Sequence, residues 1–163
     1  MNLNHCIPVL FVKDASIARD FYVNVLGFTV IMDNGGLNYA FKEGLAVWQI
    51  NPDNIIPQSL GMEAITQSNT PSRFELCFET EDLDTIHQTL KVNQTTFLHE
   101  INTEIWGQRT IRFYDPDRHL IEVGEAMPIF LKRIFEEEGR DLEATAKRTY
   151  MPIEALKQIV NLS

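Results

Sequence analysis

The stretch WGQRTIRFYDPDRHLIEVGE, Trp106–Glu125, carries the strongest structural signal in the chain. Its parts QRTIRFYD and HLIEVGE each predict a β-strand, and the residues between them predict a turn. Side chains of a strand alternate between two faces, so Ile121 and Val123 share one face and Glu122 lies on the other. Because the two branched apolar residues favour a core, Glu122 is expected to point away from that core. The surroundings of this carboxylate decide what kind of site the protein has.

The same order of elements is written twice along the chain. In residues 4–50 the predicted strand CIPVLFVKD is followed by the helix ASIARDFYVNVLGF and by three short strands. In residues 73–126 the strand FELCFETED is followed by the helix LDTIHQTLK and by three more strands. Asp14 and Asp82 stand at equivalent helix starts. Two copies of βαβββ are therefore predicted, joined by a Pro-, Asn- and Ser-rich linker, 51–72, that favours loop structure.

Residues 127–163 follow the second copy and predict three short helices. Pro128 and Pro152 suit first-turn positions, and Gly139 suits a helix stop. Basic and acidic residues are balanced in this tail, which argues against a DNA-reading helix-turn-helix. The tail is expected to pack on its own domain or on a partner subunit. Its apolar residues for that contact are Phe130, Ile134, Leu142, Ile153 and Leu156.

The composition indicates a globular protein and argues against nucleic-acid binding and a membrane span. The chain has 163 residues, of which 44% are hydrophobic, and this suits one globular unit with a core. The net charge of −9 argues against nucleic acid as a partner, because phosphate binding needs a positive field. No stretch approaches the roughly 20 apolar residues of a membrane span, and no signal peptide is recognisable. Two cysteines, Cys6 and Cys77, cannot form a disulfide framework, so a cytoplasmic location is expected.

Two signatures together identify a family. ARDFYVNVLGF at 18–28, together with WG…FYDPD…HLIE near the end of the second copy, resembles the vicinal oxygen chelate superfamily. Glyoxalase I, bleomycin-resistance proteins, fosfomycin-resistance enzymes and extradiol dioxygenases belong to it. The resemblance implies an α+β fold for residues 1–126, in which two βαβββ modules form a cupped mixed sheet, with 127–163 as an added helical tail. It also implies a homodimer.

The resemblance implies a site as well. Metal enzymes of the superfamily place one ligand on the first and one on the last strand of each module. Matched residue by residue, these positions fall at Ile7, Trp48, Glu75 and Glu122, and the resemblance directs Glu122 into the cup. Isoleucine and tryptophan cannot bind a metal. The two carboxylates that remain suit only a hard ion that keeps several waters.

Other positions are expected to border the cup. The resemblance places Trp106 in the pocket wall, with Arg109 and Phe113 on the strand behind it. His99 lies in a strand-to-loop segment nearby. Two ionised glutamates in one cup repel each other, so the pair is expected to be relieved by a bound cation, by Arg109 or His99, or by a retained proton.

Two further residues carry specific expectations. Arg118 stands where the superfamily usually has glycine, so an unusual backbone angle is expected there. Cys77 lies two residues after Glu75 and shares its strand face. A thiol beside a carboxylate should have a raised pKa, which argues against a thiolate nucleophile.

Three functions remain open at this point. The first is a binding protein without a metal or other cofactor that holds a small, partly aromatic molecule in the cup. The second is a lyase, isomerase or dioxygenase that uses one divalent metal ion on Glu75 and Glu122, with His99 or His5 as a third ligand. The third is an interaction protein whose active part is the tail. The candidate catalytic and ligand-binding residues are Glu122, Glu75, His99, Ile7, Trp48, Trp106, Arg109 and Phe113.

Overall fold

The computed structural model of the protein describes residues 7–63 and 75–160. The chain divides into two compact units, and each is described by itself. Unit 1 comprises residues 1–74 together with the short segment 114–119. Unit 2 comprises the rest of the chain, including the C-terminal helices.

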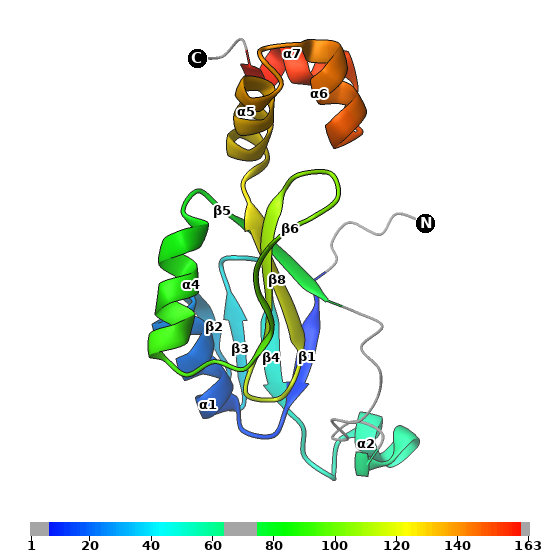
Figure 1. Ribbon diagram of the computed structural model, residues 1–163. Coiled ribbons are helices and arrows are strands. Elements are labelled where there is room, and N and C mark those ends of the chain that lie inside the picture. Colours follow the sequence, from blue (N-terminus) through cyan, green and yellow to red (C-terminus); the bar gives the residue numbers. More distant parts are fainter. Residues whose placement is uncertain (1–6, 64–74, 161–163) are drawn as a thin grey trace, which may run out of the picture. The chain divides into compact units, whose positions relative to one another are not determined.

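Unit 1 contains the first βαβββ module (Figure 1). Its elements are β1 (Val9–Val12), α1 (Ala15–Asp20), the π-helical turn η1 (Phe21–Val25), β2 (Val30–Asp33), β3 (Asn38–Phe41) and β4 (Ala46–Gln49). The strands form sheet A in the order β1-β4-β3-β2, with β1 and β4 parallel. A further helix, α2 (Ile55–Leu60), lies in the linker. The prediction of loop structure was therefore wrong for those residues.

Unit 2 contains the second module and the tail. Its elements are β5 (Leu76–Thr80), α4 (Leu83–Val92), β6 (Phe97–Thr103), β7 (Arg109–Tyr114), β8 (Leu120–Glu125), α5 (Met127–Glu137), α6 (Leu142–Thr149) and α7 (Ile153–Val160). The strands form sheet B in the order β5-β8-β7-β6. The predicted α+β fold of two βαβββ modules with a helical tail is confirmed, as two separate four-stranded mixed sheets.

The two aspartates predicted at the helix starts both act as N-caps. The Asp14 carboxylate accepts hydrogen bonds from the backbone N–H groups of Ser16 (2.8 Å) and Ile17 (3.1 Å). The Asp82 carboxylate accepts one from the backbone N–H of Thr85 at 2.9 Å. Such caps satisfy donors that have no partner within the helix, which fixes where each helix begins.

The tail folds onto unit 2 around its own small core. Phe130, Leu131, Ile134 and Leu156 are fully buried, and the partly buried Trp106 packs against them from the β6–β7 turn. Leu142 also packs on this cluster. Of the apolar tail residues named from the sequence, only Ile153 stays substantially exposed, at 36%. The tail therefore covers the end of its own module.

Residues 114–119, which are the last residue of β7 and the turn to β8, belong to unit 1, although β8 and the rest of β7 belong to unit 2. Its Asp115 is buried and accepts hydrogen bonds from the Tyr22 hydroxyl (3.1 Å) and from a His119 ring nitrogen (2.8 Å). Burial opposes a charge on His119, yet the bond to Asp115 raises the pKa of the imidazole above its usual range. Arg118 has φ +73°, which confirms the unusual backbone angle expected there.

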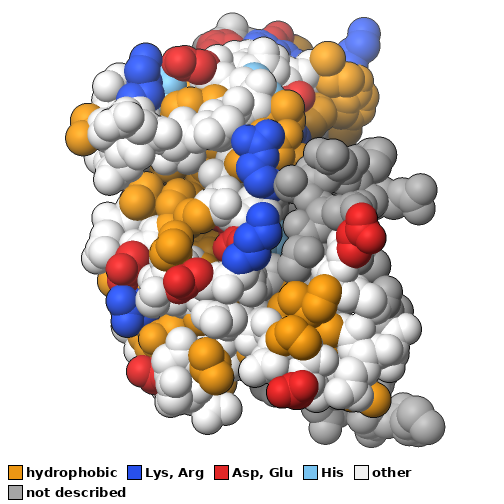
Figure 2. All heavy atoms as spheres, turned by 90° about the horizontal axis from the view of Figure 1, so that it is seen from below, with side chains coloured by type: hydrophobic (Ala, Val, Ile, Leu, Met, Phe, Trp, Pro, Cys, Tyr) orange, Lys and Arg blue, Asp and Glu red, His pale blue; other side chains and the backbone are white. Residues whose placement is uncertain are grey.

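The surface shows no single dominant character on the face drawn in Figure 2, where apolar and charged side chains are interspersed. Several large apolar side chains are exposed, among them Ile17 in α1 and Ile55 in α2. Within the described part of the chain, no helix combines the length and apolar character needed to cross a membrane.

Candidate functional site

The two faces of sheet B differ sharply in chemistry. The face toward α4 is apolar, and its buried residues are Leu76, Ile111, Phe113, Ile121 and Val123. The opposite face, which we call the charged face, carries Glu75 and Cys77 next to Glu122 of the neighbouring strand. The parallel pairing of β5 and β8 sets Cys77 directly beside Glu122. The predicted separation of Glu122 from Ile121 and Val123 therefore agrees with the structure.

Arg112 of β7 lies at the centre of the charged face. Its Nε donates to Glu75 Oε2 at 3.0 Å, and its Nη1 donates to Glu104 Oε1 at 2.8 Å. Its Nη2 makes an ion pair with Glu122 Oε2. Nη1 also lies 3.2 Å from His99 Nε2. These residues, Glu75, His99, Glu104, Arg112 and Glu122, are called the Arg112 cluster below.

The Arg112 guanidinium thus contacts three carboxylates, and the pKa values of Glu104 and Glu122 shift in opposite directions. Burial raises the pKa of Glu122 above its ordinary value, and Glu75 and Glu104 raise it further, while Arg112 acts in the opposite direction. The hydrogen bond from Arg112 lowers the pKa of Glu104. Burial disfavours the charge on Arg112, but its bonds to Glu104 and Glu75 outweigh burial and raise its pKa. The cluster keeps its arginine charged and makes Glu122 its weakest acid among the groups with a clear shift.

Exchanging Glu104 and Glu122 for glutamine is expected to change stability in opposite directions. Glu104 has a lowered folded-state pKa, so its charge stabilises the fold above its unfolded-state pKa, and that stability is lost as pH falls through the folded-state value. Glu104→Gln should therefore cost about 1–2 kcal/mol at neutral pH and less under acid conditions. Glu122 has a raised pKa, so its ionisation opposes folding at neutral pH. Glu122→Gln should leave stability unchanged or raise it by up to about 1 kcal/mol there.

Urea unfolding of both variants and of the wild type at neutral and acid pH measures this difference. The glutamine at position 122 still offers an oxygen to Arg112, so each variant is a control for the other. An equal loss of unfolding free energy in both variants at neutral pH would show that the two carboxylates stabilise the fold equally. That result would contradict the lowered pKa of Glu104 and the raised pKa of Glu122.

Arg109 and Phe113 do not join the Arg112 cluster. Arg109 pairs with Asp84 of α4 at 2.7 Å and lies 3.8 Å from Glu125. Phe113 is fully buried, and its ring lies 6.5 Å from that of Phe97. Both residues sit on the α4 side of β7, because strand alternation sends Arg109, Ile111 and Phe113 to one face and Arg112 to the other. The arginine paired with Glu75 and Glu122 is therefore Arg112 and not the expected Arg109, and His99 lies beside it.

His99 reaches the charged face because β6 is irregular. Phe97 and His99 are two residues apart, and in a regular strand both would point to the same face. The pairing of β6 with β7 shifts register between them, and Phe97 pairs with Phe113 while His99 pairs with Arg112. A bulge of this kind re-aims a side chain. His99 Nδ1 is held by the backbone carbonyl of Glu100 at 2.8 Å, which leaves Nε2 toward Arg112.

The remaining candidates lie elsewhere in the two units. Trp106 packs against the tail core, and its Nε1 donates to Gln108 Oε1 at 3.1 Å. In unit 1, Ile7 precedes β1 and is half-exposed, and Trp48 of β4 meets Phe11 edge-on at 6.0 Å. Trp48 and Phe11 are both partly buried. His5 and Cys6 lie outside the described residues.

The donor set fits a divalent metal poorly. Ligand atoms of Glu75, Cys77 and Glu122 lie within 4.8 Å of one another, which is close enough to share an ion. However, Arg112 already bonds to both carboxylates. Burial, together with Glu122 and Glu75, raises the pKa of the Cys77 thiol, as the sequence predicted, so the thiolate that a metal needs is disfavoured. A second cation at this place would meet the guanidinium charge.

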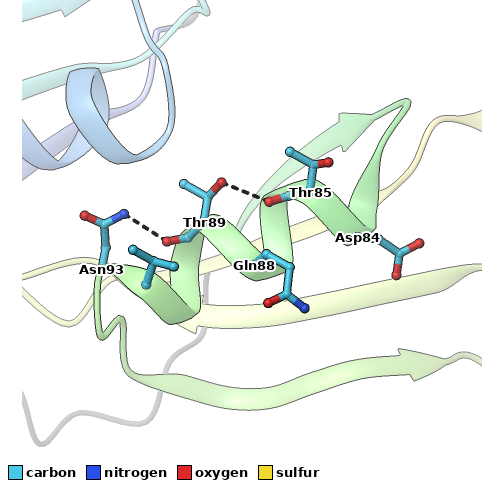
Figure 3. Close-up of a pocket in the computed structure, with 6 residues that line it drawn as sticks. Asp84, Thr85, Gln88, Thr89 and Asn93 are labelled. Atoms are coloured by element: carbon cyan, nitrogen blue, oxygen red, sulfur yellow. Dashed lines mark hydrogen bonds between the residues drawn. The ribbon is translucent and has the colours of Figure 1, made fainter.

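A separate hollow runs along the outer side of α4 (Figure 3). Its lining residues are Asp84, Thr85, Gln88, Thr89, Val92 and Asn93. They all come from α4 and its C-cap Asn93, and Asp84 is already paired with Arg109. Thr89 and Asn93 bond back to carbonyls of the preceding turn, as Figure 3 shows. The chemistry of this hollow is that of a solvated helix surface.

The fold and the site define the class of protein. The model of the glyoxalase-like domain family matches residues 5–128. The chain belongs to this family, and with it to the vicinal oxygen chelate superfamily that the two sequence signatures indicated. The match ends at the start of α5, so the tail lies outside the family domain.

Solved structures extend the comparison. A protein of unknown function from Agrobacterium tumefaciens str. C58 is 28% identical, with a TM-score of 0.66, and the match covers 78% of this chain and 97% of that one. A lactoylglutathione lyase from Agrobacterium tumefaciens is 19% identical, with a TM-score of 0.54 and coverages of 77% and 96%. The fosfomycin resistance protein FosX from Mesorhizobium loti is 15% identical, with a TM-score of 0.56 and coverages of 78% and 95%. Among curated protein sequences, none matches this chain.

Proposed function

We propose that the protein binds a small, partly aromatic molecule without a divalent metal, and that Arg112 takes the part that a metal ion plays in other members of the superfamily. One observation carries the proposal: the guanidinium bonds to Glu75 and Glu122, the two surviving positions of the family's ligand set, and also to Glu104. A permanently charged side chain satisfies these carboxylates at any physiological pH.

The charges of the Arg112 cluster favour some polar groups of a ligand over others. Three carboxylates face one guanidinium, so the charged face keeps an excess of acceptor oxygens and negative charge. Glu75 is the most accessible of the three carboxylates, with 34% of its side chain exposed. Hydroxyl and ammonium groups of a ligand match such a surface, whereas a ligand carboxylate would be repelled.

Two series of compounds that share a skeleton and differ only in charge test this function. Arylalkyl amines are expected to raise the melting temperature of the purified protein, and arylalkyl carboxylates of the same skeleton are not. A ligand at 100 times its Kd adds about 2.7 kcal/mol to the free energy of unfolding, which thermal scans resolve. Glu75→Gln should weaken the effect of the amines. Stabilisation by the carboxylates in place of the amines would reject the proposed polarity of the site.

The metal-dependent alternative is a lyase, isomerase or dioxygenase that uses Glu75 and Glu122, with His99 or His5 as a third ligand. It is favoured by the close grouping of Glu75, Cys77 and Glu122. Elemental analysis of the purified protein, followed by melting curves with and without chelator, separates the two functions. A stoichiometric metal that is lost on chelation, together with destabilised Glu75→Gln and Glu122→Gln variants, would replace our proposal by this one.

Assembly and location belong to the same proposal. We propose a homodimer, because small domains of the superfamily commonly pair. The exposed free thiol of Cys77 suits a reducing compartment, which supports a cytoplasmic protein. Light scattering on the full-length chain tests the assembly.

A further inference from the structure

The turn between β6 and β7 joins the Arg112 cluster to the tail. Glu104 opens this turn, which is closed by backbone hydrogen bonds from Glu104 to Gln108 (2.8 Å) and from Gly107 to Glu104 (2.8 Å). The Glu104 carboxylate points back along β7, where it accepts from Thr110 Oγ1 at 2.9 Å and from Arg112 Nη1 at 2.8 Å. The turn therefore supplies one of the three anions that hold the guanidinium.

The C-terminal helices contact the other side of the same turn. Trp106 packs against the buried cluster of Phe130, Leu131, Ile134 and Leu156. The Gly107 carbonyl accepts a hydrogen bond from Arg133 Nη2 of α5 at 2.8 Å. The fit at Gly107 is close, because a Cβ there would lie 2.8 Å from Ile134 Cδ1, and φ is +98°. Only glycine fits this turn against α5.

Arg133 is itself fixed by buried partners. Its Nη2 lies 2.5 Å from Glu125 Oε2, and the Glu125 carboxylate is only 7% exposed. The same Glu125 oxygen accepts from the backbone N–H of Arg109, the first residue of β7. The tail thus holds the turn at Trp106 and Gly107 and holds the start of the strand that carries Arg112.

We infer that the C-terminal helices are a positioning element for the candidate site: they hold the 104–108 turn so that Glu104 keeps Arg112 on the charged face. The inference rests on the proposed function, because it assigns the tail a role in that same site. Charged hydrogen bonds depend steeply on distance and angle, so a turn that moves freely would release the Glu104 bond while the β-sheet stays intact. Trp106 and Gly107 are positioning residues, and they touch the site only through Glu104.

Nitrogen-15 NMR of the arginine side chains measures how fast the Arg112 hydrogens exchange with solvent, and so tests whether the tail positions Arg112. Nη1 of Arg112 donates to Glu104, so exchange of the Nη1 hydrogens with solvent should be slow in the wild-type protein. Trp106→Ala removes the side chain that α5 packs against, and Gly107→Ala pushes the turn away from Ile134. In both variants the exchange of the Arg112 Nη1 hydrogens should speed up by about tenfold or more, since losing one charged hydrogen bond is worth roughly 1.5–3 kcal/mol.

Two controls separate positioning from general loss of stability. Ile159→Ala removes an apolar contact from the same tail core on α7, and its Arg112 exchange should stay at the wild-type rate. Glu104→Gln should reproduce the faster exchange, and adding Trp106→Ala to it should have little further effect. Folded Trp106→Ala and Gly107→Ala proteins with unchanged Arg112 exchange would overturn the inference, as would an equal change in Ile159→Ala. The experiment uses no ligand, so failure of the proposed ligand class does not affect its outcome.

Discussion

Replacing Arg112 by methionine is expected to turn the charged face into a divalent-cation site. The variant leaves Glu75, Glu104 and Glu122 without the guanidinium that all three contact. Methionine keeps much of the length and volume of the side chain but carries no charge. Partly buried carboxylates without a counter-ion either take up protons or bind a cation. Three oxygen donors on one face suit a hard divalent ion such as Mn²⁺.

The expected size of this effect is large. At neutral pH, Arg112→Met should lower the free energy of unfolding by about 2–4 kcal/mol, because it removes one member of a half-buried ionic network. Millimolar Mn²⁺ should restore most of this loss, and calorimetric titration should show Mn²⁺ binding at least about tenfold tighter than to the wild type. The pKa of Glu122 should rise further, since Arg112 is the group that lowers it.

Arg112→Lys is the matched control for this variant. A lysine keeps the positive charge but cannot bond to three carboxylates in the planar geometry of a guanidinium. It should be less stable than the wild type and should gain no Mn²⁺ affinity. Tight Mn²⁺ binding by the wild-type protein, unchanged in Arg112→Met, would mean that the ion binds elsewhere and that Arg112 does not replace a metal.

Ending the chain at Met127 is expected to have the second large effect. The truncation removes the helices that cover Trp106 and removes Arg133, the nearer of the two arginines paired with the buried Glu125 carboxylate. A buried charge left without any partner costs about 3–5 kcal/mol; Glu125 keeps Arg109 at 3.8 Å, so a smaller cost is expected there, and the newly exposed tryptophan adds to it. We expect a protein that melts at a clearly lower temperature or aggregates on heating.

Urea unfolding and light scattering on the full-length and truncated chains measure this effect together with the assembly. Tyr150→Asn is a suitable control in the tail, because Tyr150 is 74% exposed and asparagine tolerates its left-handed backbone. This variant should behave as the wild type. A soluble truncated protein with unchanged assembly and melting temperature would show that the tail contributes neither stability nor subunit contact.

The fold could be predicted because its helix starts and strand faces are determined by short stretches of sequence. Asp14 and Asp82 cap their helices as predicted, since an N-cap depends on only three or four consecutive residues. The apolar neighbours Ile121 and Val123 place Glu122 on the opposite face of its strand, as the structure has it. For Arg112 the signal was present but was not used: Ile111 and Phe113 flank it, and apolar residues on one face of a strand place the residue between them on the other. The family pattern had drawn attention to Arg109.

Other features of the site were beyond sequence analysis for physical reasons. The register shift that separates Phe97 from His99 leaves no mark in a strand of mixed polarity. The contribution of Glu104 depends on where a turn folds back, and that turn is held by a tail about thirty residues further along the chain. The helix α2 lies in a segment whose composition favours loops, and its six residues are too few for a periodic pattern.

The β7–β8 turn has a consequence for how the chain can be divided. The sequence is written as two copies, and a cut in the linker would appear to yield two self-sufficient halves. The first half would then lack Asp115, the buried carboxylate that receives the Tyr22 hydroxyl inside unit 1. It would also lack Asp117, whose carboxylate accepts from the backbone of Lys13 directly after β1. The first copy is therefore not an autonomous piece of this protein, because two of its hydrogen-bond partners are encoded in the second copy.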